Sequence, residues 1–123
     1  MSLSDKQWSF LRNVADLINY IDECGWKATG GDLERSYAEQ QRKVDAGLSK
    51  APAGKSRHNM RLAIDLNFWD AEGSYLPKLP LTREQHDEKF KFIADYWESL
   101  HPKNKAGLYF NSLYDPYHFE RGD

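Results

Sequence analysis

The sequence predicts an α+β fold in which helices pack on a small central antiparallel sheet. Two long segments carry apolar residues at helical spacing. Residues 62–68 instead alternate between apolar and small or polar side chains, which is typical of a strand with one buried face. Helical and extended patterns are intermingled without the regular strand–helix–strand order of a parallel sheet. The 123 residues are expected to form one domain, residues 1–123, around a single core.

The first predicted helix opens at the capping-box pattern Ser4-Asp5-Lys6-Gln7 and runs to about Glu23, with Gly25 as its stop signal. Its expected buried stripe comprises Trp8, Leu11, Ala15, Ile18 and Ile21 or Cys24.

Residues 26–35 contain a Gly-Gly pair and are expected to form a strand, a tight turn or both. A second capping box at Ser36-Tyr37-Ala38-Glu39 predicts a short helix that Gly47 ends. Residues 49–55 have the composition of a loop.

Beyond the alternating strand at residues 62–68, residues 71–74 are expected to turn. A third capping box at Thr82-Arg83-Glu84-Gln85 then opens a helix that ends before Pro102. The buried stripe of that helix is predicted to comprise Phe90, Ile93, Ala94, Trp97 and Leu100. Two short aromatic-rich strands are expected at Leu108–Phe110 and Tyr117–Glu120.

Composition narrows the class of protein. The net charge of −2 argues against a nucleic-acid binder, which would normally be basic. The stretch from Arg42 to Arg61 nevertheless holds six basic residues and one acid, so it is either a solvated face or a surface that attracts an anionic polymer or substrate. The single cysteine, Cys24, excludes an internal disulfide and fits a reducing compartment.

The N-terminus lacks the apolar run of a secretion signal, and no segment approaches the ~20 apolar residues that cross a bilayer. We therefore expect synthesis in a cytoplasm without a signal peptide and no membrane partner.

Asp65 is the most informative residue, because it lies in an otherwise apolar strand, on the face opposite Ile64 and Leu66. An unpaired carboxylate buried there would cost several kcal/mol or become protonated. It therefore needs a cation, an arginine, a metal ion or open solvent at an edge strand. Ala63, on the same face, leaves room beside the carboxylate for a bulky group.

Two histidines complete a set of candidate metal ligands. His58 lies seven residues before Asp65, and His118 follows Asp115 in an Asp-x-x-His pattern. Two imidazoles and one carboxylate match the three protein ligands of a hydrolytic zinc site that keeps one position open for water. Ser56 is expected to orient His58 through a hydrogen bond.

Two further residues could carry the chemistry. Asp115 precedes a proline, so it either only forms a turn or reaches the water at the zinc and acts as acid and base. Arg35, before a predicted helix, is either a surface residue or a fixed cation that stabilises an oxyanion.

Ser56-x-His58-x6-Asp65 followed by Asp115-x-x-His118 resembles the zinc-dependent peptidoglycan peptidases. This superfamily includes D-alanyl-D-alanine carboxypeptidases and dipeptidases as well as phage L-alanyl-D-glutamate endopeptidases. The segments Leu62–Phe68 and His118-Phe119-Glu120 resemble its short phage endolysin branch. Arg35-Ser36-x-x-x-Gln40 and Gly47-Leu48-Ser49 are similar to two further elements of the family.

The resemblance implies the hedgehog/D,D-peptidase type of α+β fold and a single catalytic peptidase domain. It implies that Zn²⁺ is bound by His58, Asp65 and His118, that Asp115 is the catalytic acid and base, and that Arg35 stabilises the substrate or the transition state. Arg61 stands where many members carry a glycine. The residues expected to contact the substrate are Arg35, Gln40, Ser49 and Arg61.

The implied function is hydrolysis of the stem peptides of bacterial peptidoglycan by a phage or prophage endolysin. Such an enzyme would be monomeric, would bind no nucleic acid and would wait in the host bacterial cytoplasm until release to the cell wall. A D-alanyl-D-alanine carboxypeptidase or dipeptidase is the alternative enzyme. The alternative outside catalysis is a zinc-binding phage structural module with little turnover.

Overall fold

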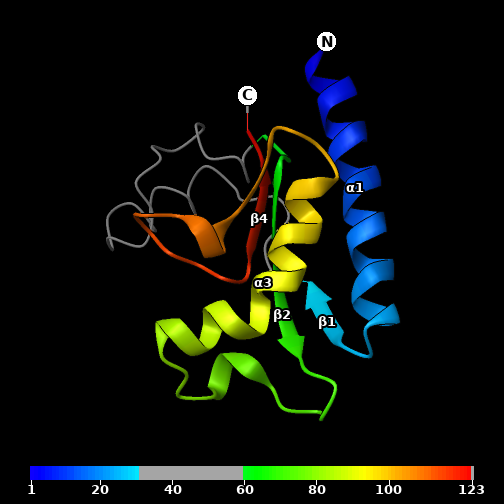
Figure 1. Cartoon of the computed structure of the whole chain (residues 1–123). Coiled ribbons are helices and arrows are strands. Elements are labelled where there is room, and N and C mark those ends of the chain that lie inside the picture. The colour runs from blue at the N-terminus through cyan, green and yellow to red at the C-terminus, as the bar shows by residue number, and fades with distance from the viewer. Residues whose placement is uncertain (31–59, 123) are drawn as a thin grey trace.

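The structure, a computed structural model, describes residues 1–30 and 60–122. Within them, four strands form one sheet in the order β1-β2-β4-β3, and all neighbouring strands are antiparallel. Their bounds are β1 Lys27–Gly30, β2 Ala63–Trp69, β3 Asn104–Ala106 and β4 His118–Arg121. Two long helices, α1 (Leu3–Glu23) and α3 (Arg83–Ser99), share one apolar core with the sheet (Figure 1). The predicted α+β fold with a small antiparallel sheet is therefore confirmed.

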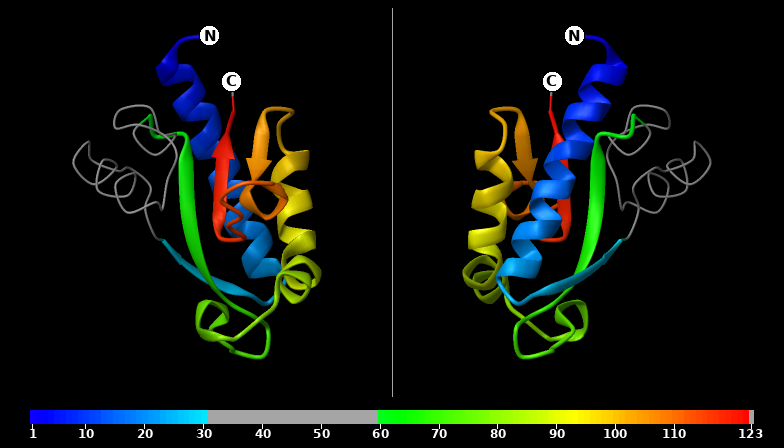
Figure 2. Two further views of the ribbon diagram at one scale, coloured as in Figure 1. Left: turned by 90° about the vertical axis from the view of Figure 1, so that its left-hand side faces the viewer. Right: turned by 90° about the vertical axis from the view of Figure 1, so that its right-hand side faces the viewer.

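The helices lie on one side of the sheet, which leaves the other side for polar residues. In the left view of Figure 2, β2, β4 and β3 lie side by side and α1 runs behind them. Residues 62, 64, 66 and 68 of the β2 region are all buried in the core with α1 and α3. Alternation along the strand then directs Ala63, Asp65 and Asn67 to the opposite face. This is the face on which the candidate site is built.

Helix α1 begins two residues earlier than predicted. Its N-cap is Ser2, whose side chain accepts a hydrogen bond from the backbone N–H of Asp5, while the Asp5 carboxylate accepts from the backbone N–H of Ser2. The predicted capping box at Ser4 is therefore wrong. The predicted end is confirmed, because Cys24 caps the helix and Gly25 follows with a left-handed φ of 79°.

The predicted buried stripe of α1 is confirmed only at Ile21 and is otherwise wrong. The helix buries Phe10, Val14, Leu17 and Ile21, whereas Trp8, Leu11 and Ile18 are 63%, 47% and 48% exposed. Both sets recur with helical spacing, so periodicity alone does not distinguish them. Packing decides between them: the ring of Phe10 contacts Trp97 of α3 edge to face, with 5.6 Å between the ring centroids.

Helix α3 follows its prediction closely. The side chain of Thr82 accepts from the backbone N–H of Gln85, and the Gln85 side chain accepts from the backbone N–H of Thr82. The helix ends at Ser99, before Pro102. Its buried residues are Phe90, Ile93, Ala94 and Trp97, with Leu100 partly buried against the core.

No helix among the described residues is long and apolar enough to span a membrane.

The predicted strand at Leu108–Phe110 is wrong. The strand lies earlier, at Asn104–Ala106, and residues Gly107–Tyr109 form a short 3-10 helix, η2. The backbone N–H of Phe110 donates to the carbonyl of Gly107, which closes this turn. Leu108 is buried in the turn, so its burial does not depend on strand pairing. The last predicted strand, Tyr117–Glu120, is confirmed one residue later as β4.

Asp70 fixes the turn that follows β2. Its side chain is only 6% exposed. One carboxylate oxygen accepts from the backbone N–H groups of Glu72 and Ser74, and the other accepts from Lys89 Nζ at 3.2 Å. The hydrogen bond from Ser74 lowers the pKa of Asp70; burial opposes this effect, and Lys89 and Glu72 add to the lowering.

These contacts make stability depend on pH. A carboxyl whose folded pKa is depressed contributes stability above its unfolded pKa of about 3.9, and this contribution is lost as the pH falls through the folded pKa. We expect Asp70→Asn to lose about 1–2 kcal/mol of unfolding free energy at pH 7. The difference from wild type should shrink at pH 3. Urea unfolding at both pH values measures it, and the exposed Asp16→Asn serves as control. An Asp70→Asn deficit that is equal at both pH values would contradict the assignment.

Candidate metal centre

Asp65 and His118 face each other across two neighbouring strands. They are register partners in the antiparallel pair of β2 with β4, the strands drawn in green and red in Figure 1. Directly opposed residues of such a pair project to the same face of the sheet. His118 Nδ1 accordingly lies 3.0 Å from Asp65 Oδ1. The two side chains are 14% and 22% exposed, so they are sheltered but open to a small ligand.

Asp115 joins this pair from the turn before β4. Its Oδ1 accepts a hydrogen bond from the backbone N–H of Tyr117 at 3.0 Å, and its carbonyl oxygen accepts from the backbone N–H of His118 at 3.2 Å. This compact turn folds the carboxylate back towards the imidazole. One ligand atom from each of Asp65, Asp115 and His118 lies within 4.8 Å of the other two. The structure therefore brings these three predicted site residues together, while their roles as zinc ligands and as acid and base stay predictions.

Gly107 allows the Asp115 turn to approach the sheet. A Cβ atom on Gly107 would lie 2.1 Å from the carbonyl oxygen of Asp115 and 3.0 Å from the Cβ of His118. The carbonyl of Gly107 also accepts a hydrogen bond from the backbone N–H of Asp115 at 3.1 Å. Only a residue without a side chain fits this contact. Gly107 is not among the predicted site residues, since nothing in the local sequence indicates that two backbones meet there.

Glu120 is a second residue that the sequence analysis missed. Its Oε1 lies 2.7 Å from His118 Nε2, and its side chain is 19% exposed. The signal was available, because residues two apart on a strand share a face. Burial lowers the pKa of His118. The hydrogen bonds that the ring makes with Asp65 and Glu120, and the negative charges of these two carboxylates, outweigh the effect of burial and raise the pKa to about 9. His118 is thus held between two carboxylates.

The donor set fits a zinc ion. Zinc in proteins is bound by imidazole nitrogen and carboxylate oxygen, which Asp65, Asp115 and His118 supply. Neighbouring ligands of a tetrahedral zinc lie roughly 3.3 Å apart when the bonds are about 2.0 Å. The 3.0 Å between His118 Nδ1 and Asp65 Oδ1 is close to that separation. The two atoms are therefore spaced as two ligands of one ion would be.

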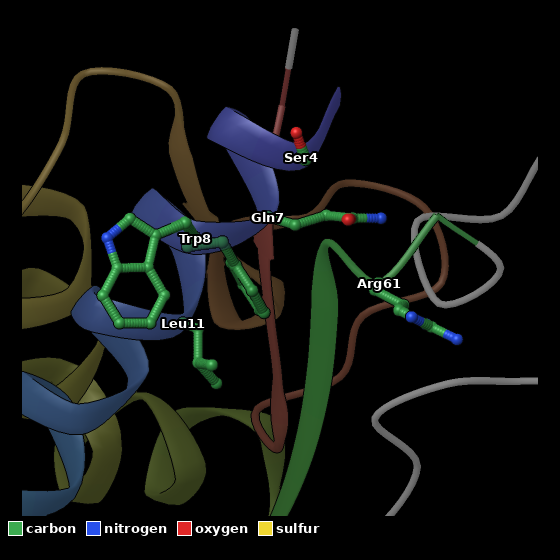
Figure 3. Close-up of a pocket in the computed structure, with 6 residues that line it drawn as sticks. Ser4, Gln7, Trp8, Leu11 and Arg61 are labelled. Atoms are coloured by element: carbon green, nitrogen blue, oxygen red, sulfur yellow. The ribbon is translucent and has the colours of Figure 1, made fainter. Parts of the chain in front are cut away.

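The remaining predicted site residues are placed as follows. Arg61 lies in the turn before β2 with a left-handed φ of 58°. It lines a hollow of about 310 Å³ together with Ser4, Gln7, Trp8, Phe10 and Leu11. Figure 3 shows its side chain pointing away from Trp8 and Leu11 of α1. Five predicted residues lie outside the described part of the chain: Arg35, Gln40, Ser49, Ser56 and His58.

Comparison with solved structures identifies the fold. The structure is similar to the L-Ala D-Glu endopeptidase ChiX of Serratia marcescens, with a TM-score of 0.67 and 21% sequence identity over 91% of this chain and 77% of that one. The chain has the fold of a peptidoglycan peptidase. It is also similar to the LdcB LD-carboxypeptidase, whose structure explains peptidoglycan recognition, with a TM-score of 0.63 and 15% identity. This match covers 92% of the present chain and 57% of LdcB.

At these identities the similarity is one of fold. No protein-family model matches the sequence, and no curated protein matches it. The activity of this chain is therefore inferred from its site, as follows.

Proposed function

We propose that this protein is a zinc-dependent peptidase that hydrolyses the stem peptides of bacterial peptidoglycan. The observation that carries the proposal is the convergence of Asp65, Asp115 and His118 on one face of the sheet. This convergence occurs in a fold shared with ChiX, an L-Ala D-Glu endopeptidase, and LdcB, an LD-carboxypeptidase. Because a fold alone does not imply a function, the proposal rests on the donor cluster, and the shared fold supports it by analogy.

In this proposal Asp65 and His118 hold the zinc ion together with His58. Bound zinc would supply Lewis acidity that activates water and polarises the carbonyl of the scissile peptide bond. Asp115 is the acid and base, because its carboxylate is held beside the Asp65–His118 pair by the Tyr117 N–H. It takes a proton from the attacking water as the new C–O bond forms, and it delivers that proton to the amine as the C–N bond breaks. Arg35 is proposed to stabilise the oxyanion.

More specifically, we propose L-alanyl-D-glutamate endopeptidase activity in a monomeric phage or prophage endolysin. The resemblance of the motif to the endolysin branch and the similarity of fold to ChiX support this choice. The protein would reside in the host cytoplasm before release to the wall, where the basic stretch 42–61 would attract the anionic polymer. A carboxypeptidase reaction is the second candidate, favoured by the similarity to LdcB.

Digestion of purified peptidoglycan tests the proposal. The protein is incubated with the polymer alone, with a metal chelator, and with chelator followed by excess zinc, and the products are identified by mass spectrometry. We expect cleavage that the chelator abolishes and zinc restores. A new amino terminus on D-glutamate identifies the endopeptidase, whereas release of a terminal D-alanine identifies a carboxypeptidase. Stoichiometric zinc without any cleavage would contradict the enzyme and favour the structural module.

A further inference from the structure

We propose that Glu120 is a positioning residue of the metal centre, which accepts the Nε2–H of His118 and thereby assigns Nδ1 as the metal-binding nitrogen. The inference rests on the proposed function, since it concerns the same zinc ion. The inference goes beyond the proposed function because the predicted zinc site of His58, Asp65, Asp115 and His118 gives Glu120 no role.

The two ring nitrogens of His118 are already differentiated by their partners. Nδ1 lies 3.0 Å from Oδ1 of Asp65, which is itself a member of the Asp65–Asp115–His118 cluster. Nε2 lies 2.7 Å from Glu120 Oε1, at the other edge of the ring. A neutral imidazole that binds a metal keeps one N–H, and the hydrogen bond made by that N–H decides which nitrogen binds. Glu120 therefore retains the proton on Nε2.

Glu120 is itself rigidly held, as a positioning residue must be. Its backbone pairs with Ala63 of β2 on one side and with Lys105 of β3 on the other. Its carbonyl oxygen accepts a hydrogen bond from the indole N–H of Trp97 at 3.2 Å, and Trp97 is fully buried. The backbone from which the carboxylate projects is thus fixed in the middle of the sheet.

The surroundings strengthen the contact. His118 and Glu120 are 14% and 19% exposed, so water competes weakly for their hydrogen bond. A carboxylate that accepts the distal N–H of a ligating histidine fixes the orientation of the ring and makes the ligating nitrogen more basic. Loss of such a partner typically weakens metal binding about 10–100-fold.

The test compares Glu120→Ala and Glu120→Gln with wild type. The zinc dissociation constant is measured by competition with a chelator of known affinity. We expect Glu120→Ala to bind zinc at least about 10-fold more weakly. Glu120→Gln should lose less, because its amide oxygen can still accept the Nε2–H. The matched controls are Glu88→Ala and Glu88→Gln on the exposed face of α3, which should bind zinc like wild type.

A spectroscopic readout separates positioning from a merely structural role. The ¹⁵N chemical shifts of the zinc-loaded protein should show His118 protonated at Nε2 and zinc on Nδ1 in wild type and in Glu120→Gln. Zinc on Nε2 of the wild-type ring, or a Glu120→Ala protein with wild-type affinity, would overturn the inference. If Glu120→Ala does not fold, the Glu120→Gln affinity and ring shifts still decide.

These measurements need no peptide substrate. If zinc is bound through Nδ1 and the Glu120 variants lose zinc affinity as expected, the role of Glu120 would stand even if no peptidoglycan were cleaved. Conversely, cleavage by a protein whose Glu120 variants bind zinc normally would overturn only the role of Glu120. A wild-type protein that binds no zinc would overturn both.

Discussion

Replacing Asp115 by asparagine is expected to reduce peptide hydrolysis about 10²–10⁴-fold while the protein keeps its zinc. The substitution preserves the turn, because an asparagine oxygen can still accept the hydrogen bond that Asp115 Oδ1 accepts from the Tyr117 N–H. It removes the group that takes up and releases the proton. The rate is measured on soluble stem peptides, and the zinc content by elemental analysis after removal of free metal.

Two comparisons make the Asp115 result interpretable. His118→Ala should lose the zinc together with the activity, because it removes a ligand. Asp16→Asn, an exposed change on α1, should leave both unchanged. The cluster geometry also allows Asp115 to bind the ion directly. A folded Asp115→Asn protein without zinc would therefore contradict the acid–base role and identify Asp115 as a ligand. An undiminished rate of hydrolysis would exclude both the acid–base role and the ligand role.

Gly107→Ala is expected to be the most damaging substitution of a residue that carries no functional group. The added Cβ would lie 2.1 Å from the Asp115 carbonyl oxygen, so the turn must move away from η2. Forced displacement of packed backbone typically costs about 1–3 kcal/mol, and we expect a loss near the upper end. Since Asp115 lies in that turn and His118 follows it at the start of β4, zinc binding should weaken as well.

Urea unfolding and zinc competition measure the two effects of Gly107→Ala. Gly30→Ala is the matched control, because a Cβ on Gly30 meets nothing described within 4 Å. The control should differ from wild type by less than about 1 kcal/mol. Equal stability and equal zinc affinity of the two variants would show that the close approach at Gly107 has no energetic weight.

Local signals predicted the parts of the fold that local interactions determine. The capping box at Thr82 and the apolar stripe of α3 were both confirmed, because the longest set of apolar residues at helical spacing in α3 is also the set that packs in the core. Helix α1 has apolar residues on two faces, and the choice of Phe10 over Trp8 depends on the packing partner. Likewise, the burial of Leu108 could not distinguish a strand from a 3-10 turn.

The site could be predicted where its residues form patterns that are uncommon in protein sequences. An aspartate in an apolar strand and an Asp-x-x-His pattern, taken together with the resemblance of the whole motif to a known family, led to a predicted site in which Asp65, Asp115 and His118 lie close together. Gly107 and Glu120 were missed because their roles depend on strand register and on a backbone contact between segments. The assignments of His58 and Arg35 remain predictions, because both lie outside the described residues.

The opposition of Asp65 and His118 links folding to ligand binding. The two residues are 53 positions apart in sequence and meet only through the β2–β4 pairing. A slip of one position between these strands would turn one of the two side chains into the apolar interior. The pairing of β2 with β4 in the correct register therefore also brings together the two side chains that are proposed to bind the ion. An ion that binds only the assembled pair stabilises the folded state by an amount that grows with the logarithm of its concentration relative to its dissociation constant, so a rise in melting temperature on adding the ion reports binding.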